Sequence, residues 1–187
     1  MIEERLYDAG LASPVGALWV ARSPLGVCRV GIGLSEERWR ALVEGEFGLP
    51  PVRDEALLDD VVAALRAYCA GQRTRFDLPL DLRRGSAFQQ RVWEAARRIP
   101  WGHTRTYGQL AQMIGAPGAA RAVGQALHRN PVPILVPCHR IVARGGAGGF
   151  ALGLEIKRAL LALEGVALTQ DETRCAEFEL FHHEPRL

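Results

Sequence analysis

The pattern of apolar positions divides the chain into a strand-containing beginning and a helical remainder. Residues 16–20 and 26–32 are short apolar runs rich in β-forming residues, and the segment 23–26 between them has the composition of a tight turn. These segments predict a β-hairpin. Apolar residues then recur at helical spacing over 36–47 and over 56–70, which predicts two helices after the hairpin. The next stretch has no sustained apolar period and is interpreted as a linker over 71–87.

Helix start and stop signals mark the second half of the sequence. The sequences SAFQ at 86–89 and TYGQ at 106–109 have the spacing of capping boxes, and the helices that they open are stopped by Pro100 and Gly115. A short turn leads to a further helix predicted over 119–128. Two short helices joined by a glycine-containing turn are typical of a helix-turn-helix.

The segment after these helices is rich in proline and glycine. Its prolines at 131, 133 and 137 exclude a regular helix, so 130–150 is predicted to be extended. A last helix is predicted over 154–164, ending before Gly165, with Ile156, Leu160 and Leu163 buried.

The composition is that of an ordinary globular protein. Of 187 residues, 48% are hydrophobic and 24% are charged, which excludes a disordered, collagen-like or coiled-coil chain. No stretch approaches the ~20 apolar residues of a membrane span, and the acidic first residues lack a secretory signal, so we expect a cytoplasmic protein. The four cysteines have no CxxC spacing, which argues against a zinc ribbon and a disulfide framework.

Charge is unevenly distributed along the chain. Residues 88–150 carry eight arginines and one acidic residue, Glu94, whereas both flanking regions are net acidic. A basic middle region indicates a surface that faces a polyanion such as nucleic acid, or simply a solvated arginine-rich face.

Cys138 is the first candidate for chemistry, although a free cysteine is more often a small buried hydrophobe. His139 follows it, and the nearby Arg140 and Arg144 would lower the pKa of its thiol and favour the nucleophilic thiolate. Successive residues of an extended strand point to opposite faces. Contact between Cys138 and His139 therefore requires either a turn at this point or a water molecule that relays the proton.

Three polar residues are further candidates. Glu164 stands in the last turn of its helix, where the helix dipole disfavours a carboxylate, so it calls for a cationic partner such as a protonated histidine, unless it is merely solvated. Tyr107 stands in the first turn of a helix and could donate a proton or bind a phosphate, or belong to the core. Asn130 precedes Pro131 and is expected to bond to nearby backbone in a turn.

Small residues occupy one stretch of the predicted second helix of the helix-turn-helix. They are Ala119, Ala120, Ala122 and Gly124. Small side chains permit close approach of a backbone to a partner, which is either DNA or a neighbouring helix. The histidines have no metal-binding spacing such as HxxxH or HExxH.

The segment NPVPILVPCHR at 130–140 is similar to the active-site signature of one family, the O6-alkylguanine-DNA alkyltransferases. The supporting matches follow in the order of the family: SPVGALWVARSPLG at 13–26, FQQRVWEA at 88–95, IPWGHTRTYGQLA at 99–111, AARAVGQAL at 119–127 and KRALLALEG at 157–165.

The resemblance implies a reaction and roles for the candidates. An alkyl group on guanine O6 in DNA is transferred irreversibly to Cys138, in a single turnover and without a cofactor. His139 would deprotonate the thiol through a water molecule, and Glu164 would orient His139. Asn130 would brace the active-site turn, and Tyr107 would protonate the leaving base and help to swing the nucleotide out of the duplex.

The resemblance also implies how DNA is bound. The helix with the small residues would enter the minor groove, and Arg121 would fill the gap that the flipped base leaves. The guanine pocket would be lined by Val142, Gly149, Phe150 and Ala151. Many relatives have glycine where this chain has Leu152, which predicts a narrower pocket and slower reaction with O6-benzylguanine than with O6-methylguanine.

The implied fold class is α+β with two domains. Residues 1–80 would form an RNase H-like domain with a small antiparallel sheet, and residues 81–168 a winged-helix-like domain with the helix-turn-helix, followed by a tail over 169–187. The expected partner is double-stranded DNA that contains O6-alkylguanine, bound by a monomer. Some relatives hold zinc in the first domain, but Cys28 and Cys69 have no histidine near them, so no metal is expected.

Three other functions share some of these features. An alkyltransferase-like protein binds alkylated DNA without transfer, but it replaces the cysteine that this chain keeps as Cys138. A cysteine hydrolase would use Cys138, His139 and Glu164 as a triad, but it would also need oxyanion donors. A helix-turn-helix regulator would not need these three residues together.

Overall fold

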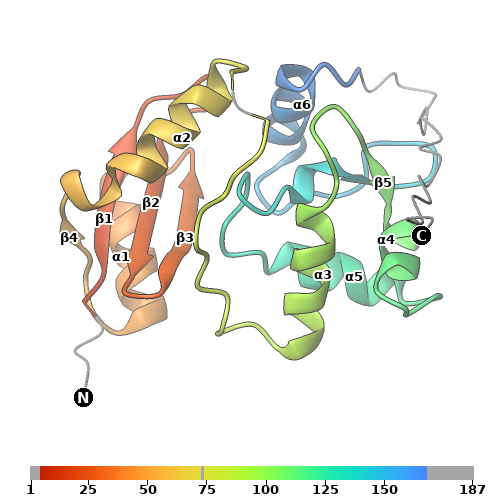
Figure 1. The fold of residues 1–187 in the computed structure, drawn as a ribbon, viewed down its shortest axis with the longest axis horizontal. Helices are drawn as coiled ribbons and strands as arrows, with labels where there is room; N and C mark the ends of the chain where they lie inside the picture. The colour runs from red at the N-terminus through yellow and green to blue at the C-terminus, as the bar shows by residue number, and fades with distance from the viewer. Residues whose placement is uncertain (1–4, 73, 168–187) are drawn as a thin grey trace, which may run out of the picture.

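The computed structural model describes residues 5–72 and 74–167, and its two halves lie side by side (Figure 1). The first half contains a sheet with strand order β3-β2-β1-β4. Strands β1 (Tyr7–Leu11), β2 (Leu18–Ser23) and β3 (Gly26–Ile32) are antiparallel, which confirms the predicted hairpin. The short β4 (Val52–Arg53) joins β1 in parallel, so the sheet is mixed rather than purely antiparallel.

Helices cover both faces of this sheet (Figure 1). Helix α1 (Glu36–Phe47) has the predicted bounds, and α2 (Asp59–Cys69) follows a 3-10 turn at Ala56–Leu58 within the predicted segment. The side chains of β2 alternate between the two faces: Leu18 and Val20 pack in the core with α2, whereas Trp19 and Ala21 pack with α1.

The second half is mostly helical. Its helices are α3 (Ala87–Arg97), α4 (Tyr107–Met113), α5 (Ala120–His128) and α6 (Leu154–Leu163). Both predicted capping boxes are present, and α4 and α5 form the predicted helix-turn-helix. A parallel pair of two-residue strands, β5 (Arg105–Thr106) and β6 (Ile141–Val142), completes this half.

The connection between the halves is docked along the sheet. The amide of Val27 donates to the carbonyl of Pro79, and the amide of Asp81 donates to the carbonyl of Val27, each at 2.9 Å. Alternate residues pack against the core: Phe76, Leu78, Leu80 and Leu82. The prediction that this stretch has no period is therefore wrong, because residues 76–82 alternate as a strand does.

Helix α6 ends before Gly165 as predicted, and Gly165 adopts a left-handed conformation with φ of 75°. Its buried face differs from the prediction, because Lys157 and Leu161 are fully buried beside Leu160, while Ile156 and Leu163 are half-buried. None of the helices described is long and apolar enough to cross a bilayer. The predicted tail at 169–187 lies outside the described residues.

Candidate active site

Cys138 lies in a turn between the two halves of the molecule. It begins a 3-10 turn, Cys138–Arg140, so the prediction of a continuously extended segment is wrong at this point. Its side chain is buried and lines a cavity of about 310 Å³ together with Asn130, Leu152 and Phe150. On the other side, the amide of Val30 in β3 donates to the carbonyl of Pro131 at 2.9 Å, which ties this segment to the sheet.

Asn130 holds the turn from inside, as predicted. Its Nδ2 donates to the carbonyl of Val136 at 2.9 Å and to Cys138 Sγ at 3.0 Å, and its Oδ1 accepts from the amide of Val132 at 3.1 Å. Within this segment Ile134 has φ of 73°, which is strained for a β-branched residue. The side chain of Asn130 therefore compensates for a backbone path that the local sequence disfavours.

Glu164 at the end of α6 bonds to the predicted histidine and to one cationic partner, Arg140. Its Oε1 accepts from His139 Nε2 at 2.7 Å and from Arg140 Nη2 at 2.9 Å, and its Oε2 accepts from Arg140 Nε at 2.8 Å. Both oxygens lie in a buried setting, because Glu164 is only 3% exposed. Sequence reasoning predicted the histidine partner but not Arg140, which also donates to the carbonyl of Ile99.

The second ring nitrogen of His139 has no hydrogen-bond partner among residues 5–72 and 74–167. His139 is fully buried, and its Nδ1 forms no hydrogen bond with the described residues. Since a carboxylate only accepts, the bond to Glu164 assigns the ring hydrogen to Nε2. The lone pair of Nδ1 is then free to accept a proton.

The resting thiol is protonated at neutral pH. Burial raises the pKa of Cys138 to about 11, against the opposing effects of the hydrogen bond from Asn130 and the charge of Lys157. The prediction that Arg140 and Arg144 lower this pKa is wrong. Arg140 is committed to Glu164, and Arg144 is exposed in the following loop.

The pKa values of Glu164 and His139 are both lowered, but for different reasons. Burial by itself would raise the pKa of Glu164, but the hydrogen bonds from His139 and Arg140 outweigh burial and lower it to about 2. Burial lowers the pKa of His139, and Glu164 only partly offsets this effect. The pair therefore rests as a carboxylate beside a neutral imidazole.

Lys157 is a site residue that sequence reasoning missed. Its side chain is fully buried, and Nζ donates to the carbonyl of Ile141 and, at 3.3 Å, to that of Gly149. Burial lowers its pKa to about 8. A signal was available, because positions 157, 160, 161 and 164 have the i, i+3, i+4, i+7 spacing of one helix face.

Tyr107 lies beside the loop that was predicted to line the pocket. Its hydroxyl donates to the carbonyl of Gly149 at 3.1 Å. Burial raises the pKa of Tyr107, and the nearby Cys138 adds a smaller rise. Tyr107, Gly149, Phe150 and Ala151 line a second cavity of about 360 Å³. Phe150 and Ala151 also line the cavity of Cys138, so the two hollows adjoin.

Val142 is fully buried in β6, where it pairs with Thr106, and it lines neither of these two cavities. Its place in a guanine pocket, like that of the loop 149–151, stays a prediction.

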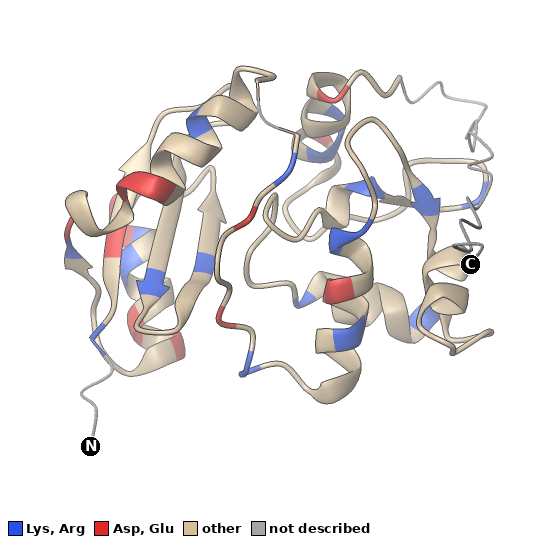
Figure 2. Cartoon of the chain, in the orientation of Figure 1, with Lys and Arg blue, Asp and Glu red and all other residues tan. Residues whose placement is uncertain are grey.

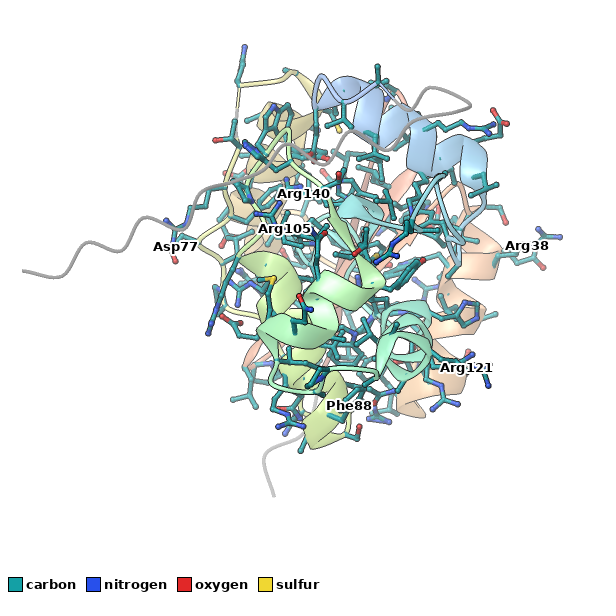
Figure 3. All side chains as sticks on the ribbon, turned by 90° about the vertical axis from the view of Figure 1, so that its right-hand side faces the viewer. Arg38, Asp77, Phe88, Arg105, Arg121 and Arg140 are labelled. Carbon is teal, nitrogen blue, oxygen red and sulfur yellow. The ribbon has the colours of Figure 1, made fainter. Side chains whose placement is uncertain are left out.

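The predicted DNA-binding residues divide between the surface and the interior of the helix-turn-helix. Arg121 and Ala122 are exposed on α5, and Arg121 projects from the edge of the molecule, whereas Arg140 lies within it (Figure 3). Ala119 and Ala120 are half-buried, and an added Cβ at Gly124 would lie 3.7 Å from the ring of Tyr107. Some of the small residues are therefore packed within the helix-turn-helix, whereas Ala122 lies on its exposed face. Arginines predominate over acidic residues around α3 and α5 (Figure 2).

Within residues 5–72 and 74–167, no three histidine, cysteine or acidic side chains are grouped as a metal site. The expectation of a zinc-free protein stays a prediction. Cys28 is buried and Cys69 half-buried, and both are free thiols.

Comparison with known proteins identifies the family. Residues 6–82 match the ribonuclease-like domain, and residues 87–166 the DNA-binding domain, of 6-O-methylguanine DNA methyltransferase. A methylated-DNA–protein-cysteine methyltransferase of Methanosarcina acetivorans is 40% identical over 163 residues, which cover 86% of this chain and 99% of the relative. The chain belongs to the methylated-DNA–protein-cysteine methyltransferase family.

Mycobacterial members of this family are also similar. A protein of the same name from Mycolicibacterium paratuberculosis is 58% identical over 104 residues, which cover 55% of this chain and 62% of that relative. A solved structure of Mycobacterium tuberculosis OGT in complex with DNA has a TM-score of 0.73 and 42% identity, over 84% of this chain and 92% of that one. The two-domain α+β fold of this chain is thus the fold of the family.

Proposed function

We propose that this protein repairs DNA by moving an alkyl group from O6 of guanine onto Cys138. The observation that carries the proposal is a buried cysteine thiol that lines a cavity, accepts a hydrogen bond from Asn130, and precedes a buried His139–Glu164 pair. Displacement at an alkyl carbon needs a soft and strong nucleophile, which a thiolate is. Membership of the methyltransferase family and the DNA-bound M. tuberculosis relative support the same substrate.

The thiol proton leaves through His139. Because the thiol pKa of about 11 keeps the proton on sulfur at rest, a base must accept it during the reaction. Nδ1 of His139 is the free ring nitrogen, and Glu164 on Nε2 stabilises the imidazolium that forms. A water molecule is proposed to relay the proton from Sγ to Nδ1.

Tyr107 is proposed to protonate the leaving base. The bond between sulfur and the alkyl carbon forms as the bond between that carbon and O6 breaks, and the electron pair of the broken bond stays with guanine. The raised pKa of Tyr107 keeps its hydroxyl protonated and able to donate. Over the whole reaction the thiol proton is moved to guanine, and Tyr107 and His139 return to their resting states.

Base extrusion brings the lesion to the thiol. An atom inside the duplex cannot reach the buried Cys138, so the nucleotide is proposed to rotate into the adjoining cavities beside Phe150. The exposed face of α5 with Ala122 would enter the minor groove, and Arg121 would fill the vacated stack. Minor-groove contacts discriminate bases poorly, so we expect weak sequence preference.

The product limits the protein to one turnover. A thioether has no easy hydrolytic exit, so each monomer would act once, and no cofactor is required.

Intact-protein mass spectrometry tests the proposal. The protein is mixed with a duplex that carries one O6-methylguanine, alongside Cys138→Ala and the matched control Cys69→Ala. We expect a gain of one methyl group, ~14 Da, in the wild type and in Cys69→Ala only. Lesion-selective binding without a mass gain would instead make this a damage-sensing protein and would refute transfer.

A further inference from the structure

Tyr68 brings the sheet-bearing half of the molecule into the site of the helical half. It lies on α2, yet its hydroxyl donates to Glu164 Oε1 at 2.7 Å and lies 3.4 Å from His139 Nε2. The side chain is fully buried, and its ring packs edge-on against Trp101 with ring centres 5.2 Å apart. A rigid aromatic ring thus delivers one hydroxyl to the junction of the histidine and the carboxylate.

We propose that Tyr68 is a positioning residue for alkyl transfer, through which the sheet-bearing half sets the orientation and basicity of His139. The inference rests on the proposed function, because it concerns the base that accepts the proton of Cys138.

The argument follows from the donors that share one oxygen. Oε1 of Glu164 accepts from His139, Tyr68 and Arg140. Each donor stabilises the negative charge and so weakens the attraction of the carboxylate for the other donors. Removing the hydroxyl of Tyr68 leaves more of that charge for His139, which favours the imidazolium over the neutral ring.

The other groups around His139 do not change with this substitution. Glu164 at the end of α6 favours the protonated ring, whereas Arg140 beside it and Lys157 on α6 oppose protonation, and Cys138 is the neutral neighbour before it. Removing the hydroxyl should therefore raise the pKa of His139. A base that must be neutral to act would then be available only at higher pH.

Tyr68→Phe separates this role from packing, because phenylalanine keeps the ring and Glu164 keeps its bonds from His139 and Arg140. The matched control is Tyr7→Phe, a change of the same chemistry on β1. Single-turnover transfer from a duplex with O6-methylguanine is measured from pH 5 to 9 for the wild type and both variants. Thermal unfolding and duplex affinity are measured at pH 7.

We expect the acid limb of the Tyr68→Phe profile to move up by about half a unit or more, which is about threefold in rate below the midpoint. Tyr7→Phe should match the wild type. A nuclear magnetic resonance titration of the His139 ring in the same proteins should show the same upward shift and needs no turnover.

Two other outcomes would each overturn a different proposal. An unmoved midpoint, with or without a uniform loss of rate, would overturn the role of Tyr68 and reduce it to packing, while transfer by the wild type still stands. Absence of transfer in the wild type at every pH would overturn the proposed function itself.

Discussion

Replacing Glu164 with glutamine removes one negative charge from the buried centre of the site. Glu164 is 3% exposed. Its carboxylate accepts hydrogen bonds from His139, Tyr68 and Arg140. The amide of Gly102 also donates to it, at 3.4 Å. Glutamine offers one acceptor oxygen, and its amide group would face the donors of Arg140. Arg140, only 4% exposed, would be left as a buried cation without its counter-charge.

The expected loss of stability is large. Removing one partner of a buried ion pair costs about 3–5 kcal/mol. The pKa of Glu164 gives a second figure, since a fall from the ordinary 4.5 to about 2 corresponds to about 3 kcal/mol in favour of the folded protein. Because both routes give a similar magnitude, we expect Glu164→Gln to lower the free energy of unfolding by about 3 kcal/mol or more at pH 7.

Urea unfolding followed by tryptophan fluorescence measures this loss. A carboxylate with a depressed folded pKa stabilises the protein above its unfolded pKa, and the contribution is lost as pH falls through the folded value. The difference between wild type and variant should therefore be complete above about pH 5 and shrink toward pH 2.

Glu155→Gln is the matched control on the same helix. Glu155 is 95% exposed at its side chain and lies 3.6 Å from Arg158, so its replacement should change stability by less than about 0.5 kcal/mol. A loss below about 1 kcal/mol for Glu164→Gln would refute the reasoning, since the buried cation would then be satisfied without the carboxylate. So would a difference that does not change between pH 5 and pH 2.5.

Four further outcomes are expected. Asn130→Ala should slow single-turnover transfer about a hundredfold, since the thiolate loses a donor; an unchanged rate would exclude this role. Arg121→Ala should weaken duplex binding about tenfold, as measured by fluorescence anisotropy. The control Arg38→Ala, at an exposed position on α1, should leave binding unchanged. Equal effects of the two substitutions would contradict a specific role for α5. Leu152→Gly should raise the rate with O6-benzylguanine more than with O6-methylguanine, because Leu152 lines the cavity of Cys138. An equal rise in rate with both substrates would show that Leu152 does not narrow the cavity for the bulky group. Iodoacetamide should label Cys138 slowly at pH 7 and about tenfold faster per pH unit toward pH 10. Peptide mass spectrometry measures the labelling. Rapid labelling at pH 7 would contradict a raised thiol pKa.

Elements specified by local signals were predictable from the sequence. The helix over 36–47 and the two capping boxes were found because a cap and a 3.6-residue period are properties of a few neighbouring residues. The same holds for Asn130, whose bonds reach at most eight residues along the chain.

Features that depend on distant partners were missed. The two-residue β4 has no pattern of its own and exists because β1 offers it hydrogen bonds. Tyr68 reads as one more apolar position of α2, since nothing nearby reveals that Glu164 will accept its hydroxyl across 96 positions of sequence. Lys157 was missed because a lysine on a helix is ordinarily solvated.

The thiol pKa shows why proximity in sequence was misleading. Arg140 follows Cys138 by two positions, but its guanidinium bonds to Glu164 and to the carbonyl of Ile99, so its charge is already compensated. Burial then dominates and keeps the proton on sulfur. In the proposed mechanism, such a thiol is activated by moving its proton at the moment of reaction rather than by ionisation at rest. We therefore expect reactivity to depend on the arrangement around His139, whose Nδ1 has no hydrogen-bond partner among the described residues and whose Nε2 bonds to the shared oxygen of Glu164.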